Sequence, residues 1–280
     1  MRIDLHTHSA VSDGTETPAQ LVRSAAEAGL DVVALTDHDT FAGLDEAHAE
    51  GERIGVEVVR GMELSCSRTH QSVHLLAYGA DPQSPGLADE LERVRDGRVG
   101  RLMPVLDKLS TLGLPLTEAD VMAQVGESPS IGRPHIADAM IAAGYIRNRA
   151  EAFDRFLYDG GPAHVRRYAI EVGHGIDLVH AAGGVAVIAH PWGRGRERLL
   201  PPEYLAQLVA ENDLDGIEVD HQDHDLDARR RLRKLADRLG VLGTGSSDYH
   251  GTGKVDHDLG CNTTDPATFV ELKRRLSPVR

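Results

Sequence analysis

The sequence predicts an α/β fold built from repeated parallel strand–helix units. Short apolar strands alternate with helices in the first and last thirds of the 280-residue chain, a pattern typical of a parallel sheet. The segment 31–36 is continuously apolar, as expected for a strand buried on both faces. Polar residues directly follow several strands, at the sheet end where α/β barrels and open sheets place their sites.

The first part of the chain opens with a short buried strand at residues 2–5. The first helix begins after Thr17, because Pro18 and Gln20 then occupy favoured first-turn positions, and it stops at Gly29. The elements that follow are a strand at 31–36, a helix at 44–54, and strands at 56–62 and 73–78.

The middle of the chain lacks the alternation of strands and helices. Between about residues 86 and 165 no strongly apolar strand appears, and helices are predicted at 87–112, 117–125, 133–143 and 149–157. These helices belong either to an insertion or to the outer layer of the main domain. We favour an insertion at 86–165, which separates residues 1–85 from residues 166–280.

Strand–helix units return in the last part of the chain. The predicted strands lie at 185–189, 216–219 and 241–244, and the predicted helices at 170–182, 202–211, 226–239 and 265–276. These strands end in polar motifs, as the earlier ones do.

Composition excludes several classes of protein. The net charge of −14 is opposite in sign to that of a non-specific nucleic-acid binder, so long DNA is not an expected partner. Cys66 and Cys261 form no Cys-x-x-Cys pair, which favours a reducing compartment. No apolar run approaches the ~18 residues of a membrane span. We expect a cytoplasmic protein without a cleaved signal peptide, since cleavage would remove His6 and His8.

Two histidines near the N-terminus point to a metal site. His6 and His8 are two residues apart, and such side chains lie on the same face of a strand. Two imidazoles that converge on one point are typical of divalent-metal ligands. The alternative is a surface strand with two chance histidines.

Further ligand-type residues weaken that alternative. Five predicted strand ends carry such residues in order, and they comprise His6 with His8, His38, Glu63, His190, and Asp248 with His250. Asp13, in the loop after the first strand, and His74, within the predicted strand 73–78, join them. One such coincidence is weak, but a repeated one indicates a shared site at the carboxyl edge of the sheet.

The motifs around these residues closely resemble those of the polymerase and histidinol phosphatase (PHP) family. They span residues 4 to 250 and comprise Asp4-Leu5-His6-Thr7-His8-Ser9, Thr36-Asp37-His38-Asp39, Gly61-Met62-Glu63, His74, Ala189-His190-Pro191 and Ser247-Asp248-Tyr249-His250.

The resemblance implies a distorted (β/α)7 barrel, formed by residues 1–85 and 166–280, that binds three divalent metals, with residues 86–165 as a helical cap. One metal would take His6, His8, Glu63 and Asp248; a second would take Glu63, His74 and His190; a third would take Asp13, His38 and His250. An aspartate at position 13 favours Mn²⁺ or Fe²⁺ over an all-zinc site, with Mg²⁺ as a further alternative.

This metal set implies hydrolysis of a phosphate ester. Three divalent ions carry more charge than the carboxylates of Asp13, Glu63 and Asp248, so the site would attract a phosphate dianion. Metals lower the pKa of bound water from ~15.7 to near 7, and a hydroxide held between two of them would attack phosphorus in line. Asp248 and His190 would act in catalysis as ligands.

Other residues are weaker candidates for substrate contacts. In Gly132-Arg133-Pro134-His135, Arg133 could bind phosphate and His135 could contact it or donate a proton; the alternative is an exposed helix cap. His221 ends a strand and could face the substrate or lie behind the ligands. Arg194, Arg196 and Lys254 are candidates for contact with a second phosphate; the alternative is that they lie on solvated loops.

Within the family, the cap and the Gly-Arg-Pro-His segment resemble small enzymes that act on nucleotides. The predicted reaction is hydrolysis of phosphate monoesters of small nucleotides, a 3′,5′-nucleoside bisphosphate or AMP. The alternatives are a 5′→3′ exoribonuclease on short RNA, a histidinol-phosphate phosphatase, and a non-catalytic metal-bound module of a polymerase.

Overall fold

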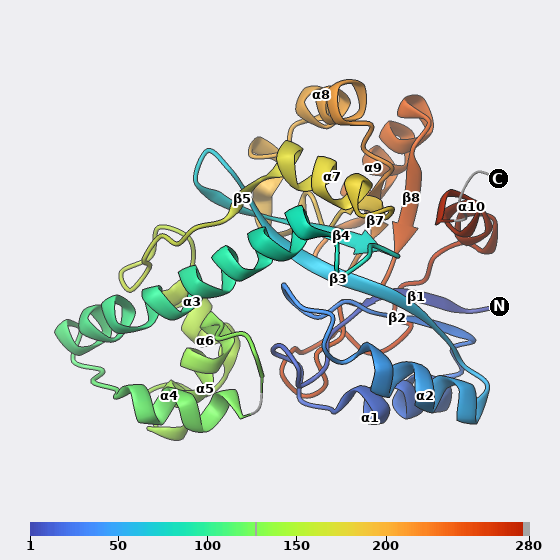
Figure 1. Ribbon diagram of the computed structural model, residues 1–280. Coiled ribbons are helices and arrows are strands. Elements are labelled where there is room, and N and C mark those ends of the chain that lie inside the picture. Colours follow the sequence, from blue (N-terminus) through green and yellow to red (C-terminus); the bar gives the residue numbers. More distant parts are fainter. Residues whose placement is uncertain (127, 277–280) are drawn as a thin grey trace.

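The computed structural model describes residues 1–126 and 128–276 and contains an eight-stranded sheet surrounded by helices (Figure 1). The strands are β1 (Ile3–Thr7), β2 (Val32–Leu35), β3 (Glu57–Arg68), β4 (Gln71–Tyr78), β5 (Ile170–Glu171), β6 (Val185–Ile188), β7 (Gly216–Asp220) and β8 (Leu242–Gly245). Their order is β1-β2-β3-β4-β6-β7-β8, with the two-residue β5 paired to β3.

The sheet closes almost completely into a barrel. The backbone N–H of His8 donates to the carbonyl of Tyr249 (2.8 Å), just after β8, and Thr264 N donates to Ile3 O (2.9 Å). Asp4, which is fully buried, also accepts hydrogen bonds from the backbone N–H groups of Ser247 and Gly260. The first strand is therefore fastened to the segment that follows the last one.

The expectation of purely parallel units is wrong for β3 and β4. These strands form an antiparallel hairpin, and β4 also pairs antiparallel with β6. Arg68 and Gln71 pair across a two-residue turn in which Thr69 and His70 have φ values of 47° and 66°. This is the pattern of a type I′ hairpin, but the turn lacks the glycine or asparagine by which such turns are usually found in a sequence.

The helices agree closely with the predicted ranges. They are α1 (Pro18–Glu27), α2 (Leu44–Ile54), α3 (Pro85–Thr111), α4 (Glu118–Val125), α5 (Arg133–Ala142), α6 (Arg149–Ala152), α7 (Val172–Ala181), α8 (Pro202–Asn212), α9 (Leu226–Leu239) and α10 (Pro266–Leu276). Thr17 and Gln20 form the reciprocal capping box expected at the start of α1. The helix predicted at 149–157 is α-helical only to Ala152 and continues as a π-helix over Phe153–Leu157.

The helices α3 to α6 form a lobe beside the barrel (Figure 1). Leu102, Leu109 and Met140 belong to an apolar core of this lobe that is separate from the barrel cores. The long helix α3 serves both parts, because its first half places Leu87 and Val94 in a barrel core. An independent insertion domain at 86–165 stays a prediction. In the described part of the chain, no helix is long and apolar enough to cross a membrane.

Candidate metal centre

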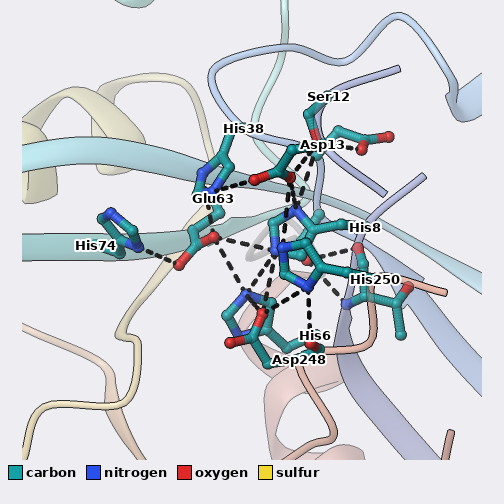
Figure 2. Close-up of polar contacts among 12 residues, drawn as sticks. His6, His8, Ser12, Asp13, His38, Glu63, His74, Asp248 and His250 are labelled. Carbon is teal, nitrogen blue, oxygen red and sulfur yellow. Dashed lines mark hydrogen bonds and ion pairs between the residues drawn. The ribbon is translucent and has the colours of Figure 1, made fainter. Parts of the chain in front are cut away.

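The structure brings the side chains of the predicted ligands together; Figure 2 labels all of them except His190, which lies 3.1 Å from Glu63 Oε1. They come from the ends of β1, β2, β6 and β8, from the loop after β1, and from the β3–β4 hairpin. Their side chains range from buried to partly buried. The convergence predicted for His6 and His8 is present, since their Nε2 atoms are 3.0 Å apart.

Glu63 lies at the middle of the group. Its Oε1 atom is 2.7 Å from His74 Nδ1 and 3.1 Å from His190 Nε2. Its Oε2 atom is 3.1 Å from both His8 Nε2 and His38 Nδ1. One carboxylate thus faces histidines on two sides, the geometry expected of a ligand shared between two ions.

Two other carboxylates face the remaining histidines. Asp248 Oδ1 lies 3.4 Å from the Nε2 atoms of both His6 and His8. Asp13 Oδ1 lies 3.4 Å from His250 Nε2. Among the described residues, four groups have donor atoms within 4.8 Å of one another, and they are His8/Asp13/His38/His250, His6/His8/Asp248, His38/Glu63/His74 and His221/Asp248/His257. The first three resemble the predicted ligand sets, although the exact division among ions stays a prediction. The fourth combines Asp248 with two histidines that were not predicted as ligands.

The donor set fits divalent cations. His38 Nδ1 is buried and forms no hydrogen bond among the described residues, although Glu63 Oε2 lies 3.1 Å away. Burial is the main influence on His38 and lowers its pKa to about 3, so the ring is neutral and one of its nitrogens offers a lone pair to a cation. Burial also dominates at His190 and lowers its pKa to about 3. Neutral imidazoles beside carboxylates are the donors that Mn²⁺, Fe²⁺ and Zn²⁺ accept.

Three residues in or beside the site have backbone φ values in the left-handed region. His190, Asp248 and Asp39 have positive φ values of 30°, 54° and 56°. Such values are unfavourable for residues other than glycine, and they persist where the surrounding structure enforces them, often at functional sites. Each of these residues follows a strand and turns its side chain as the backbone leaves the sheet.

Glu218 was missed by the sequence analysis. It is completely buried in β7, and its carboxylate lies 3.3 Å from His6 Nδ1 and accepts the backbone N–H of His190 (2.7 Å) and the hydroxyl of Ser246. It therefore orients His6 so that Nε2 points at the other ligands. The sequence feature that could have identified Glu218 is the presence of a charged residue inside the otherwise apolar segment 216–219.

His221 and Lys254 hold Asp248 from its far side. Asp248 Oδ2 lies 3.3 Å from His221 Nε2 and pairs with the ammonium of Lys254, while Oδ1 faces the ligand histidines. His221 is fully buried and does not line the cavity, so its contact is with Asp248 rather than with the substrate.

Asp37 and Asp39 flank His38 in the chain, but their hydrogen bonds go to neighbouring segments rather than to its imidazole. Asp37 accepts hydrogen bonds from Ser9 and from the Ser12 hydroxyl (2.6 Å), which fixes the loop before Asp13. Asp39 instead accepts from the backbone and side chain of Ser65 and from Arg98 of α3.

A cavity of about 1500 Å³ lies between the metal centre and the α3–α6 lobe. Arg133 lines it, and its guanidinium donates to Asp159 Oδ1 (2.6 Å) and to Leu157 O (2.9 Å). His135 is buried away from the lining, where Nδ1 accepts the N–H of Gly132 (3.0 Å). The sequence suggested that His135 either contacts phosphate or belongs to an exposed helix cap. Its buried position outside the cavity lining agrees with neither alternative.

Comparison with known proteins identifies the family. The PHP domain model matches residues 4–88. A 3′,5′-nucleoside bisphosphate phosphatase from Chromobacterium violaceum is 33% identical over 274 residues, which cover 98% of this chain and 96% of that protein. The chain belongs to the PHP family. Its nearly closed seven-stranded path confirms the predicted PHP-type barrel.

Other relatives of this PHP protein agree. A 5′-3′ exoribonuclease from Haemophilus influenzae is 31% identical over 89% of this chain and 90% of that protein. The crystal structure of a proposed metal-dependent phosphoesterase from Bifidobacterium adolescentis is 40% identical, with a TM-score of 0.92 over 98% of this chain and 96% of the other. The PHP protein is thus a metal-dependent phosphoesterase, a hydrolase of phosphate esters.

Proposed function

We propose that this PHP enzyme removes phosphate from phosphate monoesters of small nucleotides, either a 3′,5′-nucleoside bisphosphate or AMP. The observation that carries the proposal is the arginine-lined cavity that opens directly onto the ligand cluster. Guanidinium groups bind phosphate oxygens bidentately. Phe153 and Tyr158 also line this cavity and offer aromatic faces for a base. The nucleoside bisphosphate phosphatase among the relatives supports the same substrate class.

Three divalent ions, with Mn²⁺ as the first candidate, complete this proposal. The predicted sets are His6, His8, Glu63 and Asp248; Glu63, His74 and His190; and Asp13, His38 and His250. When bound, such ions supply positive charge and lower the pKa of water to near 7.

The chain's own residues then bind and orient the substrate. Arg133 reaches into the cavity from the start of α5 and binds phosphate, with Asp159 fixing the direction of its guanidinium. His135 acts indirectly, because its bond to Gly132 shapes the turn that presents Arg133. The lobe of α3 to α6 forms the roof of the cavity and restricts access of water to the reacting phosphate.

The cavity volume favours one second candidate, a 5′→3′ exoribonuclease acting on short RNA. Ligand cavities usually enclose about 300–1000 Å³, and this one of about 1500 Å³ has room for more than one nucleotide. The exoribonuclease from Haemophilus influenzae is a relative over most of its length.

The test is phosphate or nucleotide release by the Mn²⁺-loaded protein. The substrates are adenosine 3′,5′-bisphosphate, AMP, histidinol phosphate and a short 5′-phosphorylated RNA, with chelated protein and Asp248→Asn as controls. We expect turnover of the nucleotides and loss of turnover in both controls. Turnover of histidinol phosphate alone would contradict the proposal, and mononucleotide release from RNA alone would favour the second candidate.

A further inference from the structure

A group of arginines lines the same cavity as the predicted metal ligands. We call the guanidinium groups of Arg101, Arg133, Arg167 and Arg196 the arginine cluster; all four line the cavity. They come from α3, from the start of α5, and from the loops before β5 and after β6. No short sequence spacing connects them.

Arg101 is the least compensated member of the cluster. Its side chain is 7% exposed, and within residues 1–126 and 128–276 it forms no hydrogen bond or ion pair. Burial, followed by repulsion from Arg167, Arg133 and Arg98, lowers its pKa well below the ordinary value. Guanidinium groups remain protonated in proteins, so this charge is present and unpaired. An uncompensated buried charge is costly to the fold.

The rest of the cluster shows the same excess of positive charge. Burial and the neighbouring guanidinium of Arg98 lower the pKa of Arg167 to about 9. Arg196 is half-buried, and its side chain has no hydrogen bond or ion pair in the described part of the chain. The carboxylates that act on these guanidinium groups are Asp159, Asp39 and Asp223. Each of them already pairs with an arginine: Asp159 with Arg133, Asp39 with Arg98, and Asp223 with Arg194. Positive charge is therefore in excess here, in a protein whose overall charge is negative.

The position of the cluster relative to the metal centre is fixed by β4. The carboxylate of Asp159 accepts the backbone N–H of Ser72 (3.3 Å), and the Ser72 hydroxyl lies 3.3 Å from His74 Nε2. Ser72 and His74 lie on the same face of β4. Asp159, which pairs with Arg133, is therefore connected through Ser72 to a predicted metal ligand.

We propose that the arginine cluster is a second phosphate subsite, which binds the non-reacting phosphate of a nucleoside 3′,5′-bisphosphate while the other phosphate lies at the metal centre. The inference rests on the proposed function and narrows its substrate to the bisphosphate rather than AMP. A terminal phosphate dianion balances several guanidinium groups better than the single charge of an internucleotide phosphodiester does. Four cations therefore favour a terminal phosphate over RNA.

The kinetic test compares one base with one or two phosphates. Arg101→Gln and Arg196→Gln are assayed with Mn²⁺ on adenosine 3′,5′-bisphosphate, AMP, adenosine 3′-monophosphate and a 5′-phosphorylated dinucleotide. Because a bond to a charged group is lost, we expect kcat/KM for the bisphosphate to fall about 10- to 100-fold. The values for both monophosphates should change less than about threefold. Arg230→Gln, an exposed change on α9 with the same loss of charge, should leave all substrates unaffected.

A binding test separates this inference from the proposed function. Inorganic sulfate is titrated into the full chain, before and after chelation, at constant ionic strength, and the melting temperature is recorded. Sulfate should stabilise the parent protein and Arg230→Gln but not Arg101→Gln. Without sulfate, Arg101→Gln should melt no lower than the parent, since it removes an unpaired buried charge.

The outcomes are distinct. If Arg101→Gln lowers kcat/KM equally for all substrates, or keeps the full sulfate response, the second phosphate subsite is refuted while the phosphatase proposal stands. A larger loss on the dinucleotide than on the bisphosphate would also refute it. If the parent releases phosphate from no nucleotide but its sulfate response depends on Arg101, the subsite stands and the proposed function fails.

Discussion

Arg98 and Asp39 form a buried ion pair that joins α3 to the segment after β2. The Nε and Nη2 atoms of Arg98 lie 2.9 and 2.5 Å from the same oxygen of Asp39, Oδ2. Both side chains are almost completely buried, and the pair also holds the hydroxyl of Ser65. The lobe and the barrel are therefore connected by a charge interaction immediately beside His38.

The first prediction concerns this pair. Arg98→Met should lower the free energy of unfolding by about 3–5 kcal/mol, because it leaves the Asp39 carboxylate buried without its partner. Urea denaturation measures the change. Arg93→Met, which breaks a pair on the same helix whose arginine side chain is 59% exposed, should cost less than about 1 kcal/mol. Equal losses in the two variants would show that the Arg98 pair is no more important than a surface contact.

The second prediction concerns Asp248, which lies between the ligand histidines and Lys254. Asp248→Ala should reduce kcat by more than about 100-fold. Loss of a residue that only orients a metal ligand typically costs about 10- to 100-fold in activity, and loss of a ligand itself should cost more. Circular dichroism should show an intact fold, and metal analysis should show fewer ions per chain. Retained activity with unchanged metal content would remove Asp248 from the proposed ligand set.

The third prediction concerns Glu218, whose carboxylate supports His6 from behind. Glu218→Gln should weaken metal binding or kcat about 10- to 100-fold, because the amide cannot accept all the hydrogen bonds now made to the carboxylate. Titration of Mn²⁺ into chelated protein, followed by calorimetry, measures the affinity. Glu52→Gln, an exposed change on α2, is the matched control and should behave as the parent.

The fourth prediction concerns pH. Burial opposes protonation of His8, but its hydrogen bonds with Asp248 and Glu63 outweigh burial and raise its pKa from 6.5 to about 10 in the metal-free protein. A cation must therefore displace a proton at pH 7, and Mn²⁺ affinity should rise about tenfold per pH unit from pH 7 to 9. Calorimetry in buffers of different ionisation enthalpy should detect about one proton released. A pH-independent affinity would contradict a protonated His8.

The same proton has a predictable effect on the metal-free fold. Since the folded-state pKa of His8 lies above its ordinary value, its protonation stabilises the folded chain fully below about pH 6.5. That contribution should decline as the pH rises toward 10. Asp39 behaves in the opposite sense, because Arg98 overcomes the effect of burial and lowers its pKa to about 2. Its contribution is present above pH 3.8 and is lost as the pH falls toward 2.

The sequence predicted best the features that leave a local pattern. The capping box at Thr17, the apolar strands and the polar residues that follow them are all local, and they located both the barrel and the ligand candidates. The β3–β4 hairpin was not predicted because Thr69 and His70 are unusual residues for its turn. Arg101 could not be recognised from the sequence because its significance depends on arginines that only the tertiary fold brings near it.

The fastening of β1 to the segment after β8 also constrains how the enzyme is made. Ser247 and Asp4, which meet beside the ligands, are separated by 243 positions in the chain. Contacts of such long range form slowly, because a large loop must close before they contribute stability. On the ribosome, His6 and His8 emerge early, but Asp248 can join them only after nearly the whole chain has been synthesised. A nascent chain stalled before that point should bind metal weakly. The full metal affinity should therefore appear only when the complete chain has folded.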